Sequence, residues 1–235
     1  RQPGRVVIRR GLGPVLLSLG LILGCAGSDD GTRADVNPAD VEIRTHSEEL
    51  LAAGRDAFRF DTFGDEVFWG DTIGLHRSIA GAANGGTGDG LTPRAALALG
   101  LKVDVDALPG GVRQAISRGT VDLDSPQTTL ALLELDAVVG IKGFFDADGT
   151  LLSIGTQCAL CHSTVDDSLA PGIGQRLDGW ANRDLNVGEI IAFAPDLSVL
   201  SSLLGVDEDT VRAVLRSWGP GKFDASLLLD GKAFR

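Results

Sequence analysis

Cys158-Ala159-Leu160-Cys161-His162 places two residues between two cysteines and a histidine directly after the second. This C-x-x-C-H spacing is the signature of c-type haem attachment, in which the two thiols add across the two vinyl groups of a haem. The histidine is then positioned to bind the iron as an axial ligand. We therefore expect one covalent haem c on Cys158 and Cys161, with His162 as the proximal iron ligand.

Two other kinds of site use a C-x-x-C pair, and the sequence favours neither. A structural zinc site needs two more well-spaced ligands, but the chain holds only three cysteines and three histidines and has no second C-x-x-C or H-x-x-x-H. A thioredoxin-like redox pair is expected within a βαβ pattern, which is absent here. The haem interpretation remains the strongest.

The N-terminus resembles an export signal. Four arginines lie among the first ten residues, and the uncharged apolar run 11–24 follows them. Such a run is too short to span a bilayer as a helix but suits a signal peptide. The run ends at Cys25 in Ile-Leu-Gly-Cys, which is similar to a lipobox. We expect residues 1–24 to be a signal peptide and Cys25 to be lipidated; the alternative is a cysteine discarded on cleavage.

The composition is acidic and rich in glycine. After residue 24 the chain keeps 17 basic and 32 acidic residues, a formal net charge of −15, which argues against nucleic-acid binding. The 32 glycines, about twice the average share, predict short elements and many turns. A haem could supply apolar core to such a chain. We expect a periplasmic protein with a redox partner, tethered to the membrane only by its lipid.

Local signals divide the chain into four parts. Residues 25–44 are predicted to be a flexible tether, 45–135 a helical N-terminal part and 136–235 a haem-binding part. The capping box Thr45-x-x-Glu48 predicts the first helix start, and alternating β-formers predict a hairpin over 137–155 before the motif. We expect a mainly α fold with a cytochrome c-like haem domain, in which a helical start at Thr156 or Gln157 carries the motif and a loop covers 163–186. The other expected helices are 45–60, 65–79, 93–99, 111–118, 126–133, 187–193, 197–204 and 207–218.

The sixth iron ligand is left open by the sequence. The chain contains no methionine, so it cannot complete the His/Met pair of ordinary electron-transfer cytochromes c. His76 is the favoured candidate because helical spacing places it on one face with Trp69 and Ile73. The alternatives are His46, a lysine, an open position, or a His76 that only packs or caps. Two histidines would favour electron transfer, whereas an open position would admit peroxide or O₂.

Other residues after the motif are candidate haem contacts. Arg176 and Arg183 are expected to pair with the haem propionates, and the Trp180 indole N–H to donate at the haem edge. The alternative is a solvated loop with one buried tryptophan. The carbonyl of Pro171 is a candidate acceptor for the second nitrogen of His162, which would tune its basicity.

Several phrases of the sequence are similar to large bacterial di-haem c-type cytochromes related to cytochrome c peroxidases and rubber oxygenases. They are Cys-Ala-Leu-Cys-His-Ser-Thr-Val-Asp, Pro-Gly-Ile-Gly and Arg-Leu-Asp-Gly-Trp within 155–184, and the segments 63–69, 100–109 and 218–224. The resemblance covers most of 45–235 and implies peroxidase or oxygenase chemistry. Those relatives carry a second C-x-x-C-H, whereas this sequence has one, which puts peroxidase activity in doubt.

We therefore expect an exported c-type cytochrome that transfers electrons through one haem. The first alternative is an enzyme, the N-terminal half of a di-haem peroxidase or oxygenase in which peroxide or O₂ reacts at one iron. The second alternative is a structural or assembly subunit in which haem only stabilises the fold.

Overall fold

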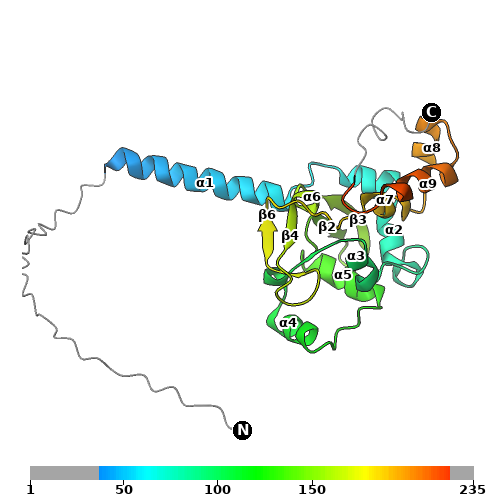
Figure 1. Ribbon diagram of the computed structural model, residues 1–235, viewed down its shortest axis with the longest axis horizontal. Coiled ribbons are helices and arrows are strands. Elements are labelled where there is room, and N and C mark those ends of the chain that lie inside the picture. The colour runs from blue at the N-terminus through cyan, green and yellow to red at the C-terminus, as the bar shows by residue number, and fades with distance from the viewer. Residues whose placement is uncertain (1–36, 223–235) are drawn as a thin grey trace, which may run out of the picture. The chain divides into compact units, whose positions relative to one another are not determined.

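The computed structural model describes residues 37–222. The chain divides into residues 1–44 and residues 45–235. The predicted signal peptide, the Cys25 lipidation site and most of the predicted tether lie outside the described residues. Within 37–222, no helix combines the length and the apolar character needed to cross a bilayer. The described part is mainly α, as predicted, with six short strands (Figure 1).

The first helix starts earlier than predicted. Helix α1 (Pro38–Phe60) begins directly after Asn37, whose Oδ1 accepts a hydrogen bond from the backbone N–H of Ala39 at 3.1 Å. Asparagine followed by proline is a strong start signal, because proline fits the first helical position and asparagine caps it. Residues 38–44 are therefore helical rather than part of a tether, and Thr45 lies inside the helix.

The predicted helix over 65–79 is two segments. A π-helical segment, η1 (Val67–Thr72), ends before Gly74, which adopts a left-handed backbone with φ of 63°. Helix α2 (Leu75–Ala80) starts after this residue. Trp69, Ile73 and His76 therefore do not share one continuous helix, contrary to the prediction.

The following short helices agree with their predictions. Thr92 Oγ1 accepts from the backbone N–H of Ala95 at 3.2 Å and Pro93 opens the helix, as their sequence predicted. Ser125 precedes another proline start, but its side chain makes no capping hydrogen bond. The elements of this region are α3 (Pro93–Ala98), α4 (Gly110–Ser117), α5 (Pro126–Glu134) and the 3₁₀ turns η2 (Ala82–Asn84) and η3 (Val105–Ala107).

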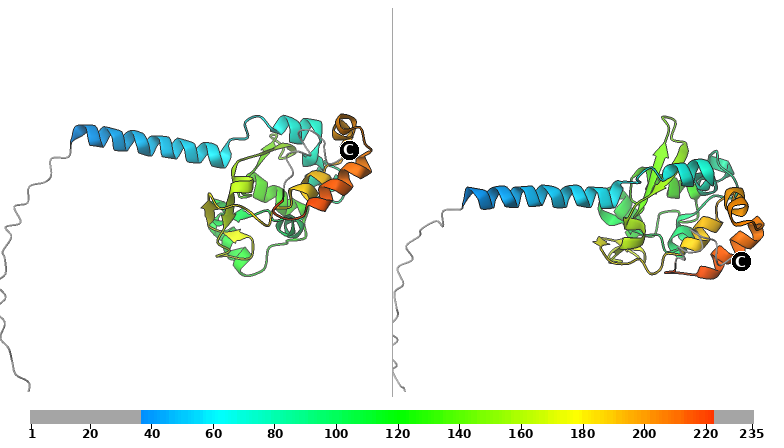
Figure 2. Two further views of the ribbon diagram at one scale, coloured as in Figure 1. Left: turned by 45° about the horizontal axis from the view of Figure 1, so that its top comes forward. Right: turned by 90° about the horizontal axis from the view of Figure 1, so that it is seen from above.

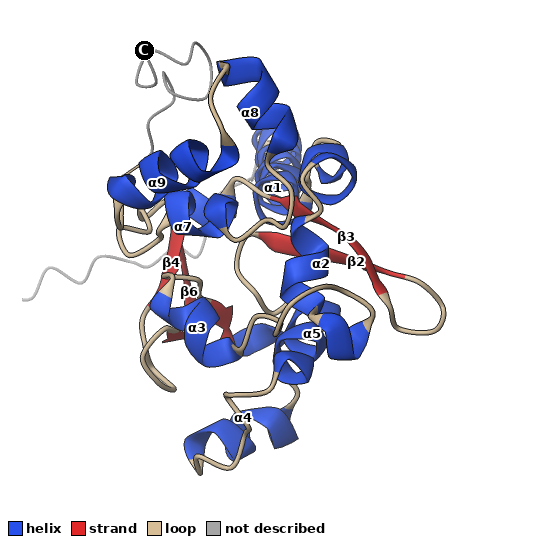
Figure 3. Cartoon of the chain, turned by 90° about the vertical axis from the view of Figure 1, so that its right-hand side faces the viewer, coloured by secondary structure: helices blue, strands red, loops and turns tan. Residues whose placement is uncertain are grey.

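The predicted β-hairpin before the motif is confirmed. Strands β2 (Ile141–Phe145) and β3 (Leu151–Thr156) pair antiparallel, with Ile141 opposite Thr156. Helices α2 and α5 lie against this hairpin (Figure 3). The segment 163–186, predicted as a loop, contains three strands: β4 (Ser163–Val165) and β6 (Arg176–Asp178) pair antiparallel, and β5 (Ile173–Gly174) pairs parallel with β1 (Val103–Asp104).

Three C-terminal helices complete the fold and match their predictions. They are α7 (Val187–Ala192), α8 (Ser198–Leu204) and α9 (Glu208–Trp218), and Asp207 caps α9 by accepting from the N–H of Thr210 at 2.8 Å. Helix α9 lies along α7 (Figures 2 and 3). Gly188 permits this approach, because a Cβ there would lie 1.9 Å from the carbonyl oxygen of Leu215.

Candidate functional site

The C-x-x-C-H motif forms one helical turn, as predicted. Helix α6 (Ala159–His162) follows Cys158, and the N–H of His162 donates to the Cys158 carbonyl at 3.1 Å. Ala159 and Leu160 are buried and fix the turn in the core, whereas Cys158, Cys161 and His162 are exposed. Both thiols are free. The three side chains expected to bind haem therefore project from a buried turn.

The segment 179–182 holds the end of this turn. The N–H of Gly179 donates to the His162 carbonyl at 2.8 Å, and the N–H of Asn182 donates to the Cys161 carbonyl at 2.9 Å. The side-chain amide of Asn182 reaches a third carbonyl, that of Leu160, at 3.5 Å. The last carbonyls of a helix lack intrahelical partners, so these bonds stabilise the turn. Asn182 was not predicted, because no local signal in the sequence links it to the motif.

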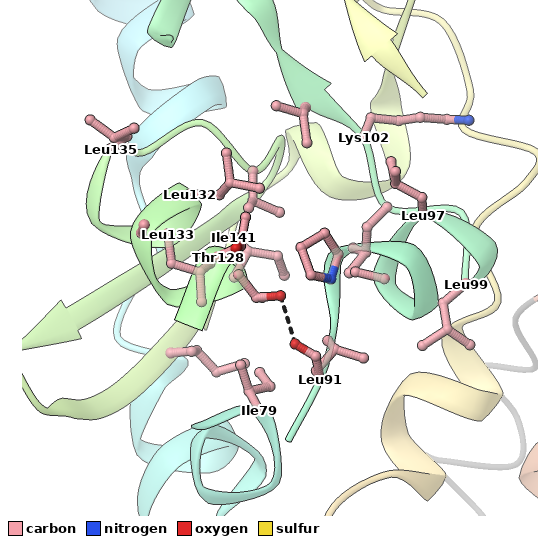
Figure 4. Close-up of a pocket in the computed structure, with 18 of the residues that line it drawn as sticks. Ile79, Leu91, Leu97, Leu99, Lys102, Thr128, Leu132, Leu133, Leu135 and Ile141 are labelled. Atoms are coloured by element: carbon pink, nitrogen blue, oxygen red, sulfur yellow. Dashed lines mark hydrogen bonds between the residues drawn. The ribbon is translucent and has the colours of Figure 1, made fainter. Parts of the chain in front are cut away.

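A large apolar cavity lies beside the motif. Its volume is about 820 Å³, and Leu160 and Cys161 form part of its wall. Figure 4 shows Leu132 and Ile141 on one side and Leu97 across from them. The Oγ1 of Thr129, another wall residue, donates to the backbone carbonyl of Leu91 at 2.6 Å, so this hydroxyl is satisfied (Figure 4). The cavity is thus a mainly hydrocarbon-lined space that the second motif cysteine borders.

Few charged groups reach this cavity. Among the described residues, its ionisable wall residues are Lys102, Asp122 and Cys161. Lys102 is only 8% exposed, and its Nζ donates to Asp184 at 2.6 Å. Figure 4 shows its amine directed away from Leu132 and Ile141. Partial burial of the Cys161 thiol, followed by the neighbouring Cys158, raises its pKa, although the residue as a whole is exposed. Partial burial and the neighbouring Cys158 thus both disfavour the charged thiolate form of Cys161 next to the cavity.

The structure does not place His76 on the cavity wall. Leu75 and Ile79, four residues apart on α2, line the cavity, whereas His76 does not. It is half-buried, and its Nδ1 has no hydrogen-bond partner among the described residues. Burial and the nearby Arg77 lower the pKa of His76. His46, the other candidate, is exposed on α1.

Arg176 lies in an ion cluster rather than on the cavity wall. Its nearly buried guanidinium has its Nε 3.4 Å from Asp178 and 3.8 Å from Asp104. Burial lowers the pKa of Arg176. Asp178 also accepts from Arg59 Nε at 2.6 Å and Ser163 Oγ at 2.8 Å, bonds that outweigh burial and lower its pKa. The cluster joins the end of α1 to β6 and to the residue after the motif.

The other predicted haem contacts stay at the surface. Trp180 is 67% exposed, so the alternative prediction of a buried tryptophan is wrong. Arg183 is exposed, and neither residue lines the cavity. Pro171 lies in the turn between Ala170 and Ile173, which bond to each other through their backbones. The structure thus brings Cys158, Cys161 and His162 together on one turn, of which Cys161 lines the cavity, and it keeps Trp180 in the segment bonded to that turn.

Within residues 37–222, no group of three or more His, Cys, Asp or Glu side chains is arranged to hold a metal ion. No protein-family model, curated protein or solved structure matches the chain.

Proposed function

We propose that this chain is an exported c-type cytochrome that holds one haem through Cys158 and Cys161, with His162 as an axial ligand, and transfers electrons. One observation carries the proposal: the second motif cysteine borders an apolar cavity of about 820 Å³. Ligand and cofactor pockets have volumes of about 300–1,000 Å³ and mostly apolar walls. A cavity of this kind next to C-x-x-C-H suits a macrocycle attached at its edge.

The donor set also suits a haem. The porphyrin supplies the equatorial ligands of the iron, so the protein needs only axial ones, and a single histidine next to the thiols is enough. Leu97, Leu132 and Ile141 on the cavity wall would exclude water from the ring. When bound, the haem supplies one-electron redox chemistry. A mainly α chain with a hairpin leading into the motif is compatible with a cytochrome c-like haem domain.

A second candidate is an enzyme in which peroxide or O₂ reacts at the haem, as the N-terminal half of a di-haem peroxidase or oxygenase. The position of His76 favours it. The sequence has no methionine, and its two histidines outside the motif, His46 and His76, do not line the cavity. Lys102 has its amine engaged by Asp184. A site without a strong protein ligand opposite His162 would be open to small molecules.

Haem attachment is tested by the pyridine haemochrome spectrum of the exported chain. We expect a c-type spectrum in the wild type, a band shifted toward one free vinyl group in Cys158→Ser or Cys161→Ser, and no covalent haem in the double variant. His162→Ala should change the axial ligation, whereas His46→Ala, which alters an exposed histidine on α1, should not. A wild-type chain without covalent haem would overturn the proposal.

The candidate functions differ in how the haem reacts. An electron carrier reduces and reoxidises rapidly with small mediators and is inert to peroxide. A high-spin haem that peroxide oxidises within seconds would support the enzyme instead. A haem that exchanges electrons with neither class of reagent would leave only the role of stabilising the fold.

Export and tethering are tested separately from haem binding. Radiolabelled palmitate should enter the wild-type chain in a bacterial host and should not enter Cys25→Ser. Release of wild-type chain as an unlabelled soluble periplasmic protein would contradict the lipid anchor and leave the haem proposal intact.

A further inference from the structure

Asn182 is a buried amide directly behind the cavity wall. The residue is only 7% exposed. Its Nδ2 donates to the carbonyl of Gly100 at 2.9 Å and to that of Leu160 at 3.5 Å. Leu99, Leu101 and Leu160 all line the cavity, so Asn182 joins two separate segments of its wall. The backbone N–H of Asn182 fixes it further to Cys161, one residue before the proposed axial ligand.

These bonds determine which way the Asn182 amide points. The carbonyl oxygens of Gly100 and Leu160 both accept from the amide, and only its NH₂ group can donate to them. The Oδ1 must therefore face away from these two carbonyls. That Oδ1 is buried and has no hydrogen-bond partner among the described residues. A buried acceptor without a donor is unfavourable, and most native polar groups avoid it. The amide is therefore anchored with its acceptor ready for a donor.

We propose that Asn182 is the positioning residue of the axial histidine, its Oδ1 accepting the Nδ1–H of His162 when the ring binds iron through Nε2. This inference rests on the proposed haem site. A metal-bound histidine almost always donates its second N–H to a protein acceptor, which fixes the tautomer and the ring orientation. The sequence suggested the Pro171 carbonyl for this role, whereas Asn182 contacts the motif turn directly and carries the unpartnered acceptor.

Backbone hydrogen bonds hold Asn182 next to the motif turn, which carries His162, the proposed donor. Segment 179–182 bonds to three successive carbonyls of the motif turn, those of Leu160, Cys161 and His162. His162 is exposed, and its carbonyl is bonded to Gly179, three residues before Asn182. A neutral amide acceptor would orient the imidazole and raise its basicity less than a carboxylate would.

The test compares Asn182→Ala with Asn182→Asp in the haem-loaded chain. Both variants lose the two amide donors to Gly100 and Leu160, so this loss is common to both. Only Asn182→Asp keeps an acceptor, and a stronger one. We expect Asn182→Ala to raise and Asn182→Asp to lower the haem reduction potential, each by a roughly tenfold change in the reduction equilibrium, or about 59 mV for one electron. The Fe–His stretching frequency of the ferrous five-coordinate form should fall in the alanine variant and rise in the aspartate variant.

Asn84→Ala is the matched control. Asn84 Nδ2 donates to the Ala80 carbonyl at 2.9 Å, so this variant also deletes a partly buried amide bond, in the 3₁₀ turn η2 and, within the described residues, with no bond to the motif turn. It should lower the free energy of unfolding without moving the potential or the Fe–His frequency. Shifts of the same sign in both Asn182 variants, or an equal shift in the control, would overturn the positioning role.

A measurement on the unaltered chain covers the case in which the variants do not fold. In ¹⁵N-labelled haem-loaded protein, the Nδ1–H of His162 should exchange slowly with solvent, because Asn182 is buried; fast exchange would reject the inference. A pyridine haemochrome spectrum without covalent haem rejects the proposed function and this inference with it. Attached haem with fast Nδ1–H exchange rejects the inference alone.

Discussion

The backbone of Gly140 lies directly against the backbone of Leu160. A Cβ on Gly140 would be 2.1 Å from the Leu160 nitrogen, and Gly140 has a left-handed backbone with φ of 79°. Its carbonyl accepts from the N–H of Gln157 at 3.0 Å, one residue before the motif. The entry to the hairpin and the C-x-x-C-H turn therefore pack backbone to backbone, and glycine is required where they meet.

Gly140→Ala should destabilise the chain strongly, because the added methyl group meets main-chain atoms that cannot rotate away. Forcing a left-handed backbone on alanine costs about 1–2 kcal/mol. The clash with Leu160 should bring the total to about 3 kcal/mol or more. The free energy of unfolding in urea measures this effect, and haem attachment should fall in parallel as the turn is displaced.

Gly149→Ala is the control for that clash. Gly149 has almost the same φ, 80°, but nothing lies within 4 Å of an added Cβ. The free energy of unfolding of this variant should fall only by the cost of a left-handed backbone at alanine, about 1–2 kcal/mol. Equal losses at both positions would show that the approach to Leu160 contributes nothing.

Asp65 connects η1 to the end of the hairpin. Its carboxylate accepts from Trp69 Nε1 at 2.9 Å and from the N–H of Thr156 at 2.9 Å, and also from the Thr156 hydroxyl. Hydrogen bonds to charged groups contribute about 1.5–3 kcal/mol each, and removal leaves their donors unpaired. Asp65→Ala should lower the free energy of unfolding by roughly 3 kcal/mol. Asp61→Ala, which removes one exposed bond to the Phe63 N–H, should lower it by under about 1 kcal/mol.

Features with local causes could be predicted from the sequence. The Thr92-Pro93 start, the Asp207 cap and the hairpin over β2 and β3 are each set by neighbouring residues, and each is confirmed. The helical turn of the C-x-x-C-H motif is confirmed for the same reason. The start of α1 has an equally local signal in Asn37-Pro38, which the predicted tether over 25–44 does not take into account.

Features that depend on long-range packing could not be predicted. Gly74 interrupts a pattern that otherwise suits one helix, and His76, two residues after the break, does not line the cavity. Arg176 suited a haem propionate by its charge, but besides the nearby Asp178 it has a second carboxylate neighbour, Asp104, on a strand far away in the sequence. Asn182 contacts Gly100 across an equally long separation. No spacing rule connects such pairs before the chain is folded.

The thiol of Cys161 should react slowly before haem is attached. Burial, then Cys158, raises its pKa, so less thiolate is present at a given pH than in an unfolded chain. In a haem-free chain carrying Cys25→Ser and Cys158→Ser, the alkylation of Cys161 by iodoacetamide should have a midpoint at higher pH than in denaturant. The Cys161 thiol is still partly buried in this variant, although the effect of Cys158 on its pKa is removed. Coincident midpoints in the folded and denatured chains would contradict the desolvation of this thiol beside the cavity.

His76 should make the chain less stable in mild acid. Burial, followed by Arg77, lowers its pKa below the ordinary 6.5, and Asp71 opposes this only in part. Below that ordinary value the unfolded chain binds more protons than the folded chain, so stability falls as the pH drops through this range and is regained above it. His76→Gln removes the titrating group. The wild type should therefore lose more free energy of unfolding than the variant between about pH 7.5 and about pH 5.5 in urea titrations; parallel losses would show that His76 titrates alike in both states.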